Sequence, residues 1–148
     1  MKIAITSGYF NPIHPGHIEC FKLAKELPNV SRLCVIVNND EQAFLKRGVS
    51  SFQKQEDRIK IVKSIKWVDD VVMSSDKDLT VCDTLNDVAL YYKVNYPGNK
   101  LLFCKGGDRF SGNIPEEEIC KRLGISLIDG LGDKTHNSSD YISGLKKL

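Results

Sequence analysis

Two histidines, His14 and His17, flank a proline and a glycine at the point where an apolar strand gives way to a helix. Ile3-Ala4-Ile5 indicates a short buried strand before them, and apolar residues recur at helical spacing over 18–27. The imidazoles therefore stand beside the N–H groups and the positive end of a helix, where phosphate binds readily. Gly16 has no Cβ, so a ligand can approach its backbone closely. The pattern predicts a site for a nucleotide's phosphates.

The stretch from Gly8 to His17, GYFNPIHPGH, resembles the HxGH signature of the cytidylyltransferase-like nucleotidyltransferases and the G-x-F-[DN] element that precedes it. The resemblance implies that His14 and His17 are catalytic and donate hydrogen bonds to the α-phosphate and the bridging oxygen of a nucleoside triphosphate. It also implies a set of nucleotide-binding residues around them: Ser7, Gly8, Tyr9, Phe10 and Gly16.

Two cations follow the expected second strand over 33–37. Lys46, beside Arg47, is expected in the loop after that strand, and Arg58 at the start of a helix over 55–66. With the V-D-D-V-V run that follows, they resemble the family's K…E-x-R…V-D-x-V-V stretch. The resemblance implies that Lys46 and Arg58 are catalytic residues that reach phosphates. Composition alone also allows solvated surface charges at both positions.

Two further segments resemble phosphate-binding elements of the family. Lys105-Gly106-Gly107-Asp108 ends an expected strand over 100–104 and is similar to its K-G-G-D element, although a turn with an Asx hydrogen bond would use the same residues. Ser138 and Ser139 match the hydroxyl core of its I-S-[ST]-T-x-x-[RK] signature, and Lys134 can replace the missing arginine. Asp140 departs from the signature, and Ser138 could also be a simple helix N-cap.

The elements that would position these residues alternate along the chain. Strands are expected over 67–73 and 125–128 besides those already named, and helices over 82–94 and from Pro115 to Gly124, with a closing helix capped by Ser138 or Ser139. Strands that are apolar along their length predict an α/β fold whose parallel sheet is covered on both faces. The resemblance implies a Rossmann-like three-layer sandwich with a five-stranded sheet of order 3-2-1-4-5, in one domain over residues 1–148.

Composition excludes several classes of protein. The 148 residues carry a net charge of +2, with 41% hydrophobic and 27% charged residues. That charge is too small to predict binding to nucleic acid or to a membrane surface. No apolar run approaches the roughly 20 residues that span a bilayer. Because the chain begins inside a predicted strand, no signal peptide is expected, and the expected location is cytoplasmic.

Five cysteines and three histidines raise two other kinds of site. Cys20, Cys34, Cys82, Cys104 and Cys120 form no C-x-x-C pair, so reduced and mostly buried thiols are expected rather than disulfides or a catalytic cysteine. His14, His17 and His136 could chelate zinc, but no H-E-x-x-H motif accompanies them. No metal bound directly by the protein is expected.

The predicted reaction is nucleotidyl transfer from a nucleoside triphosphate, CTP in preference to ATP, to a small phosphorylated acceptor such as a sugar or polyol phosphate. Mg²⁺ would bridge the triphosphate's oxygens, and pyrophosphate would leave. A catalytically silent nucleotide-binding module of the same fold is the alternative, favoured by Asp140 and the missing arginine. A dinucleotide-dependent oxidoreductase is disfavoured, since the first strand–helix turn lacks G-x-G-x-x-G. Many family members are dimers, and the sequence leaves both a monomer and a homodimer open.

Overall fold

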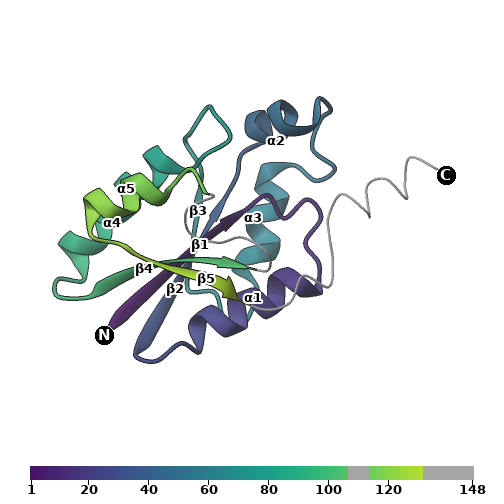
Figure 1. Cartoon of the computed structure of the whole chain (residues 1–148). Coiled ribbons are helices and arrows are strands. Elements are labelled where there is room, and N and C mark those ends of the chain that lie inside the picture. Colours follow the sequence, from purple (N-terminus) through teal and green to yellow (C-terminus); the bar gives the residue numbers. More distant parts are fainter. Residues whose placement is uncertain (107–113, 132–148) are drawn as a thin grey trace.

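The computed structural model describes residues 1–106 and 114–131, in which strands and helices alternate (Figure 1). The elements are β1 (Lys2–Gly8), α1 (Pro15–Lys25), β2 (Val30–Val37), α2 (Asp40–Arg47), α3 (Gln55–Lys63), β3 (Asp70–Met73), α4 (Cys82–Asn95), β4 (Lys100–Gly106), α5 (Glu117–Leu123) and β5 (Ser126–Leu131).

The strands form one five-stranded sheet in the order β3-β2-β1-β4-β5, and every neighbouring pair is parallel. The predicted fold class and strand order are therefore confirmed. β1 lies in the middle, with Ile5 opposite Cys34 of β2 on one side and Phe103 of β4 on the other. The carboxyl end of β1 is consequently flanked by the carboxyl ends of β2 and β4.

Helices cover both faces of the sheet, which explains why the strands are apolar along their length. Ile3 and Ile5 of β1 face a core cluster with α4 and α5, whereas Ala4 belongs to a second cluster with α1 and α3. Successive residues of a strand point to opposite faces, so each strand contributes to both clusters. The central residues of β1 and β2 have no exposed surface.

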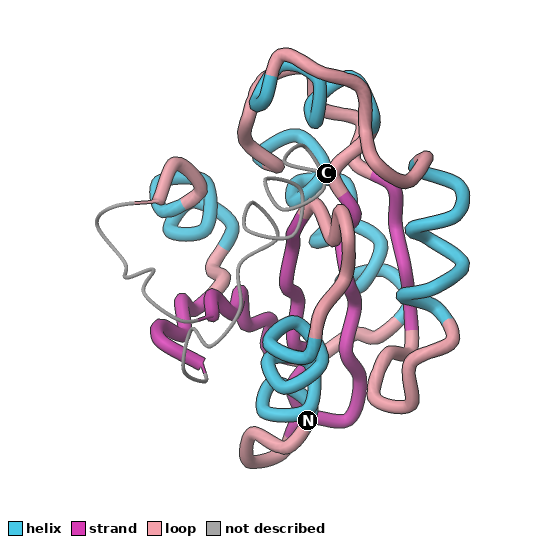
Figure 2. Tube along the Cα trace, turned by 90° about the vertical axis from the view of Figure 1, so that its right-hand side faces the viewer, coloured by secondary structure: helices cyan, strands magenta, loops and turns pink. Residues whose placement is uncertain are grey.

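The connections that follow β1, β2 and β3 gather at the end of the molecule opposite the N-terminus (Figure 2). The segment that holds α2 lies at this end in both views (Figures 1 and 2). Asn38 N–H donates to the Gly8 carbonyl at 2.9 Å, which continues the β1–β2 ladder past the strand ends. Ligands of open parallel sheets bind at this edge, where the strand order reverses.

Several element boundaries differ from those predicted, as at Lys63, where α3 ends, and at Leu131, where β5 ends. Lys46 and Arg47 are not in a loop, because they form the last turn of α2. The strand predicted over 67–73 begins only at Asp70, since the carboxylate of Asp69, rather than a backbone carbonyl, accepts the Leu33 N–H at 2.8 Å. The predicted closing helix lies outside the described residues.

The helices are short. The longest in the described ranges, α4, has 14 residues, and no helix there has the length and apolarity needed to cross a membrane.

Candidate functional site

The histidine pair stands at the first turn of α1. His14 is the N-cap with extended backbone angles (φ −144°, ψ 170°), Pro15 is the first helical residue, and His17 is the third. Proline suits that position because its fixed φ is already helical and it lacks an N–H that would go unbonded. The N–H groups of this turn carry the partial positive charge of the helix and face the sheet's carboxyl edge.

The two imidazole rings are stacked, with their centroids 3.6 Å apart and their planes 19° apart. The backbone N–H of His14 donates to His17 Nδ1 at 3.1 Å. An Nδ1 that accepts a hydrogen bond carries no proton, so a neutral His17 carries its proton on Nε2. Burial, and secondly the neighbouring His14, lowers the pKa of His17 to about 3. His17 is therefore a neutral hydrogen-bond donor through Nε2 near neutral pH.

Phe10 packs against the His17 ring. It has a left-handed backbone conformation (φ 51°) and meets His17 edge-on at a centroid distance of 4.9 Å. A Cβ on Gly8 would lie 2.7 Å from the Phe10 ring, so the glycine is needed to make room for it. Phe10 is 4% exposed. Gly8 thus makes room for the Phe10 ring, and Phe10 packs against His17. The contact of both residues with a nucleotide stays a prediction.

Lys105 and Ser7 come together across the ends of two adjacent strands. Lys105 Nζ donates to Ser7 Oγ at 3.2 Å and lies 4.6 Å from the centre of the Phe103 ring. Glu116, a buried residue before α5, holds its carboxylate 3.8 Å from the same ammonium group. Glu116 falls within the helix expected from Pro115 to Gly124, and nothing in the sequence pattern singles it out.

Lys46 reaches the site from the last turn of α2. Its ammonium group lies 4.4 Å from the centre of the Tyr9 ring, in a cation–π contact. The sequence contained signals for this helix: Asn39 accepts from Gln42 N–H as an N-cap, and Gly48 ends the helix at φ 73°. The structure thus brings together Lys46 and Tyr9, whose roles toward the nucleotide stay predictions.

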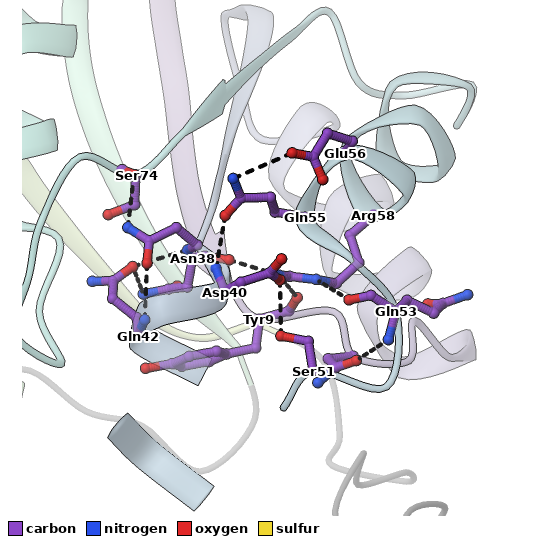
Figure 3. A network of polar contacts seen from close by, with 12 residues as sticks. Tyr9, Asn38, Asp40, Gln42, Ser51, Gln53, Gln55, Glu56, Arg58 and Ser74 are labelled. Carbon is purple, nitrogen blue, oxygen red and sulfur yellow. Dashed lines mark hydrogen bonds and ion pairs between the residues drawn. The ribbon is translucent and has the colours of Figure 1, made fainter. Parts of the chain in front are cut away.

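Arg58 is placed differently from the prediction. Its side chain has no exposed surface, and its guanidinium donates to three backbone carbonyls and to the Asp40 carboxylate (Figure 3). Most of its donors are thus taken up inside the protein, and the contact of Arg58 with a phosphate stays a prediction. An acidic residue after Asn39 is typical of a helix's first turn, and nothing in the sequence connects Asp40 with Arg58.

Several predicted site residues lie outside the described residues: Gly107, Asp108, Lys134, Ser138 and Ser139, together with Asp140 and His136. Gly106 is described as the last residue of β4, opposite Leu131 of β5. Gly16, the second residue of α1, lies in the turn between the two histidines.

Metal and thiol chemistry find little support in the described ranges. No three histidine, cysteine or carboxylate side chains gather there in a way that could hold a metal ion. All five cysteines are free, as expected, and Cys34, Cys104 and Cys120 are buried. Burial raises the pKa of the Cys104 thiol to about 12, which keeps it protonated and unreactive. What the described site offers is a set of donors for an anion: a helix N-terminus, the His17 Nε2–H and two lysines.

A family model of cytidylyltransferase-like proteins matches residues 5–126. The chain belongs to the cytidylyltransferase-like family. The match extends from β1 to the first residue of β5 and so includes both histidines, Lys46 and Lys105.

Curated relatives in this family carry two kinds of name. FAD synthase of Pyrococcus horikoshii is 36% identical over 77 residues, which are 52% of this chain and 51% of the relative. Ethanolamine-phosphate cytidylyltransferase of Mus musculus is 32% identical over 148 residues, which cover 92% of this chain and 34% of the relative. The chain thus spans about half, or less, of the length of these relatives.

Solved structures share the fold. A lipopolysaccharide core biosynthesis protein from Thermoplasma volcanium superposes with a TM-score of 0.66 at 22% identity, over 90% of this chain and 98% of that one. A bifunctional NMN adenylyltransferase/ADP ribose pyrophosphatase from Francisella tularensis gives 0.65 at 16% identity, over 99% and 42%. Identities this low support the fold and no more.

Proposed function

We propose that this protein is a nucleotidyltransferase that transfers CMP or AMP from a nucleoside triphosphate to a small phosphorylated acceptor and releases pyrophosphate. The observation that carries the proposal is the stacked histidine pair at the start of α1, with the Nε2 proton of His17 set by the His14 N–H. A cytoplasmic location is part of the proposal.

In the proposed reaction an oxygen of the acceptor's phosphate attacks the α-phosphorus in line. The bond from the α-phosphorus to its bridging oxygen breaks, and the electron pair leaves with pyrophosphate. Such a transfer requires positioning and stabilisation of charge rather than covalent help from the protein. The Nε2–H of His17 would donate to an oxygen whose negative charge grows, and a neutral donor needs no proton transfer to do so.

The remaining cationic groups would hold the phosphates. Lys46 and Lys105 approach the strand ends from opposite sides of β1, one from α2 and one from β4. The proposed substrate is the magnesium complex of the triphosphate, in which the ion neutralises phosphate charge. The described residues offer no cluster of three metal-ligating side chains, so the ion would be carried by the phosphates themselves.

The base and the acceptor are the finer part of the proposal. The relative named ethanolamine-phosphate cytidylyltransferase, whose match covers 92% of this chain, favours CTP. The relative named FAD synthase keeps an adenine nucleotide open. Both names are consistent with an acceptor that carries a phosphate.

Pyrophosphate release tests the proposal directly. CTP and ATP, each with Mg²⁺, are crossed against a panel of phosphorylated sugars, polyols, amino alcohols and FMN. We expect release that needs one acceptor and falls about 10²–10³-fold in His17→Ala, the loss typical of one preorganised donor. Lys60→Ala, an exposed change on α3, is the control.

Two negative outcomes have different meanings. Nucleotide binding by calorimetry without release on any acceptor would support the silent module instead. Absence of both binding and release would overturn the assignment. A His17→Ala enzyme with more than about a tenth of the wild-type kcat would remove His17 from the mechanism.

A further inference from the structure

The guanidinium of Arg58 is the most completely enclosed charged group in the described residues. Nε donates to the Gln53 carbonyl at 3.0 Å, Nη1 to the carbonyls of Tyr9 and Asn38 at 2.7 and 2.6 Å, and Nη2 to Asp40 Oδ1 at 2.7 Å. Four of its five N–H groups are thereby used. Only one N–H, on Nη2, is left, so a phosphate held by two donors would require one of these bonds to be broken.

These bonds join segments that are distant in the sequence. Tyr9 follows β1, Asn38 follows β2, Asp40 begins α2, and Gln53 lies in the connection between α2 and α3 (Figure 3). Asp40 Oδ1 also accepts from Ser51 Oγ at 2.8 Å. A planar, five-donor group is suited to hold several oxygens at fixed angles, which a lysine ammonium is not.

The bond to Tyr9 acts one residue away from the support of the catalytic histidine. Phe10 follows Tyr9, has φ 51°, and packs its ring edge-on against His17. The same loop is tied a second time, because Gln53 N–H donates to Asn11 Oδ1 at 2.8 Å. The unusual backbone of Phe10 is thus held between two anchors, both of which depend on the segment that Arg58 and Asp40 organise.

The ionised carboxylate of Asp40 stabilises the buried guanidinium of Arg58. Burial raises the pKa of its carboxyl, but the hydrogen bonds from Arg58 and Ser51 outweigh burial and hold that pKa below its usual value. The carboxylate is 38% exposed, so it closes the buried guanidinium toward solvent.

We propose that Arg58 and Asp40 are a pair of positioning residues that sets the loop between β1 and α1, and through Phe10 the orientation of His17, without contacting the nucleotide. The proposal rests on the proposed function, because the orientation of His17 matters only if His17 serves a reaction. It replaces a direct phosphate contact by Arg58.

Substitution of Arg58 separates positioning from phosphate binding. In Arg58→Lys we expect kcat to fall about 10²-fold while the KM for the triphosphate changes less than about threefold, because a displacement of about 1 Å has that effect on rate. A phosphate ligand would behave otherwise: lysine would keep much of the affinity, and Arg58→Met would raise KM at least about tenfold. Lys60→Met removes an exposed cation from the same helix and is the control.

Substitution of Asp40 gives a test on a partly exposed residue, should the Arg58 variants fail to fold. Asp40→Ala should lower kcat about tenfold, and Asp40→Asn, which keeps an oxygen for Arg58 and Ser51, should restore most of it. If Arg58 bound phosphate, removing the competing carboxylate would instead tighten triphosphate binding. Asp57→Ala, an exposed change in the first turn of α3, is the matched control.

A measurement on the free protein distinguishes failure of this inference from failure of the proposed function. The ¹⁵N resonances of the His17 ring should shift in Asp40→Ala and stay unchanged in Asp57→Ala, whatever the wild-type activity is. An unchanged His17 ring in a folded Asp40→Ala, or a tighter-binding Asp40→Ala enzyme, would overturn the positioning role. An inactive wild-type protein with the shift present would overturn only the proposed function.

Discussion

At the scale of single residues, the protonation of His17 is the feature with most consequence. A histidine with a pKa near 6.5 would change charge in the physiological range, and the charged form would lose the acceptor at Nδ1. Here burial, and then the proximity of His14, lowers that pKa to about 3. The protein therefore presents the same donor, Nε2–H, over the whole range in which it would work.

The ring of His17 should stay neutral on acidification. We expect the ¹⁵N spectrum of the free protein to show the Nε2–H form of His17 unchanged from pH 8 to pH 5, where an ordinary histidine is almost fully protonated. Spectra of His17→Gln assign the signals. A midpoint near pH 6.5 would contradict the role given to burial.

Replacing His17 by amides of different length tests which nitrogen acts. The amide nitrogen of glutamine falls near the place of Nε2 and that of asparagine near Nδ1, so His17→Gln should keep more activity than His17→Asn. We expect His17→Asn to lose about 10²–10³-fold in kcat, as for removal of one preorganised donor. The measurement is steady-state pyrophosphate release, and equal losses in the two variants would argue against an Nε2 donor.

At the scale of elements, α2 connects the site to the far edge of the sheet. Its N-cap, Asn39, accepts from Gln42 N–H at 2.8 Å and donates to the carbonyls of Ser74 and Asp76 at 2.9 and 3.0 Å. The helix is therefore fixed at its start to the connection after β3, and at its end it carries Lys46 to the Tyr9 ring. Lys46 depends on the cap for its place.

Removing this cap should cost stability. Asn39→Ala is expected to lower the free energy of unfolding by about 1–3 kcal/mol, since it loses an N-cap and leaves two carbonyls without their donor. Asn39→Asp keeps the cap oxygen but sets a carboxylate oxygen against the same two carbonyls, so it should lose at least as much. Urea unfolding checks both, with Asn95→Ala, an exposed amide at the end of α4, expected within about 0.5 kcal/mol of wild type. Equal stability of Asn39→Ala and wild type would show that the cap is not needed.

At the scale of the whole molecule, folding lowers the pKa of several ionisable groups in different parts of the structure. The pKa of His17 is lowered by burial and by His14. In the Asp70 carboxyl, hydrogen bonds from Arg32 and Tyr92 outweigh burial, so that its pKa also lies below its usual value. In each case the unfolded chain binds protons more readily than the native one, so acid favours unfolding.

This difference sets a pH range for stability. Above pH 6.5 His17 is neutral in both states and contributes no slope, whereas between pH 6.5 and about 3 the unfolded state holds one more proton there. The free energy of unfolding should then fall by up to about 1.4 kcal/mol per pH unit on this account, and the carboxylates add to the loss near and below pH 4. Urea unfolding at pH 7, 6 and 5 should show a flatter dependence in His17→Gln, and parallel curves would refute the assignment.

The sequence by itself determined the class of fold and the place of the histidines. Strands as apolar as Cys34-Val35-Ile36 are typical of a sheet covered on both faces. Proline, as at Pro15, suits the first position of a helix. Both requirements are local, because they depend on residues that are close together in the sequence. The helix α2 was within reach of the same reasoning, because Asn39 and Gly48 are ordinary cap residues.

Only the tertiary structure decided what Arg58, Gly8 and Glu116 do. A buried arginine and a solvated one have the same place in a helical pattern. The three carbonyls that bind Arg58 come from segments that meet only in the fold. Position 8 needs glycine because the ring of Phe10, whose backbone is left-handed, occupies the space that a Cβ would take. Glu116 faces Lys105 from another element. Contacts between distant segments depend on tertiary packing, and the hydrophobic pattern of a single sequence does not predict which segments come into contact.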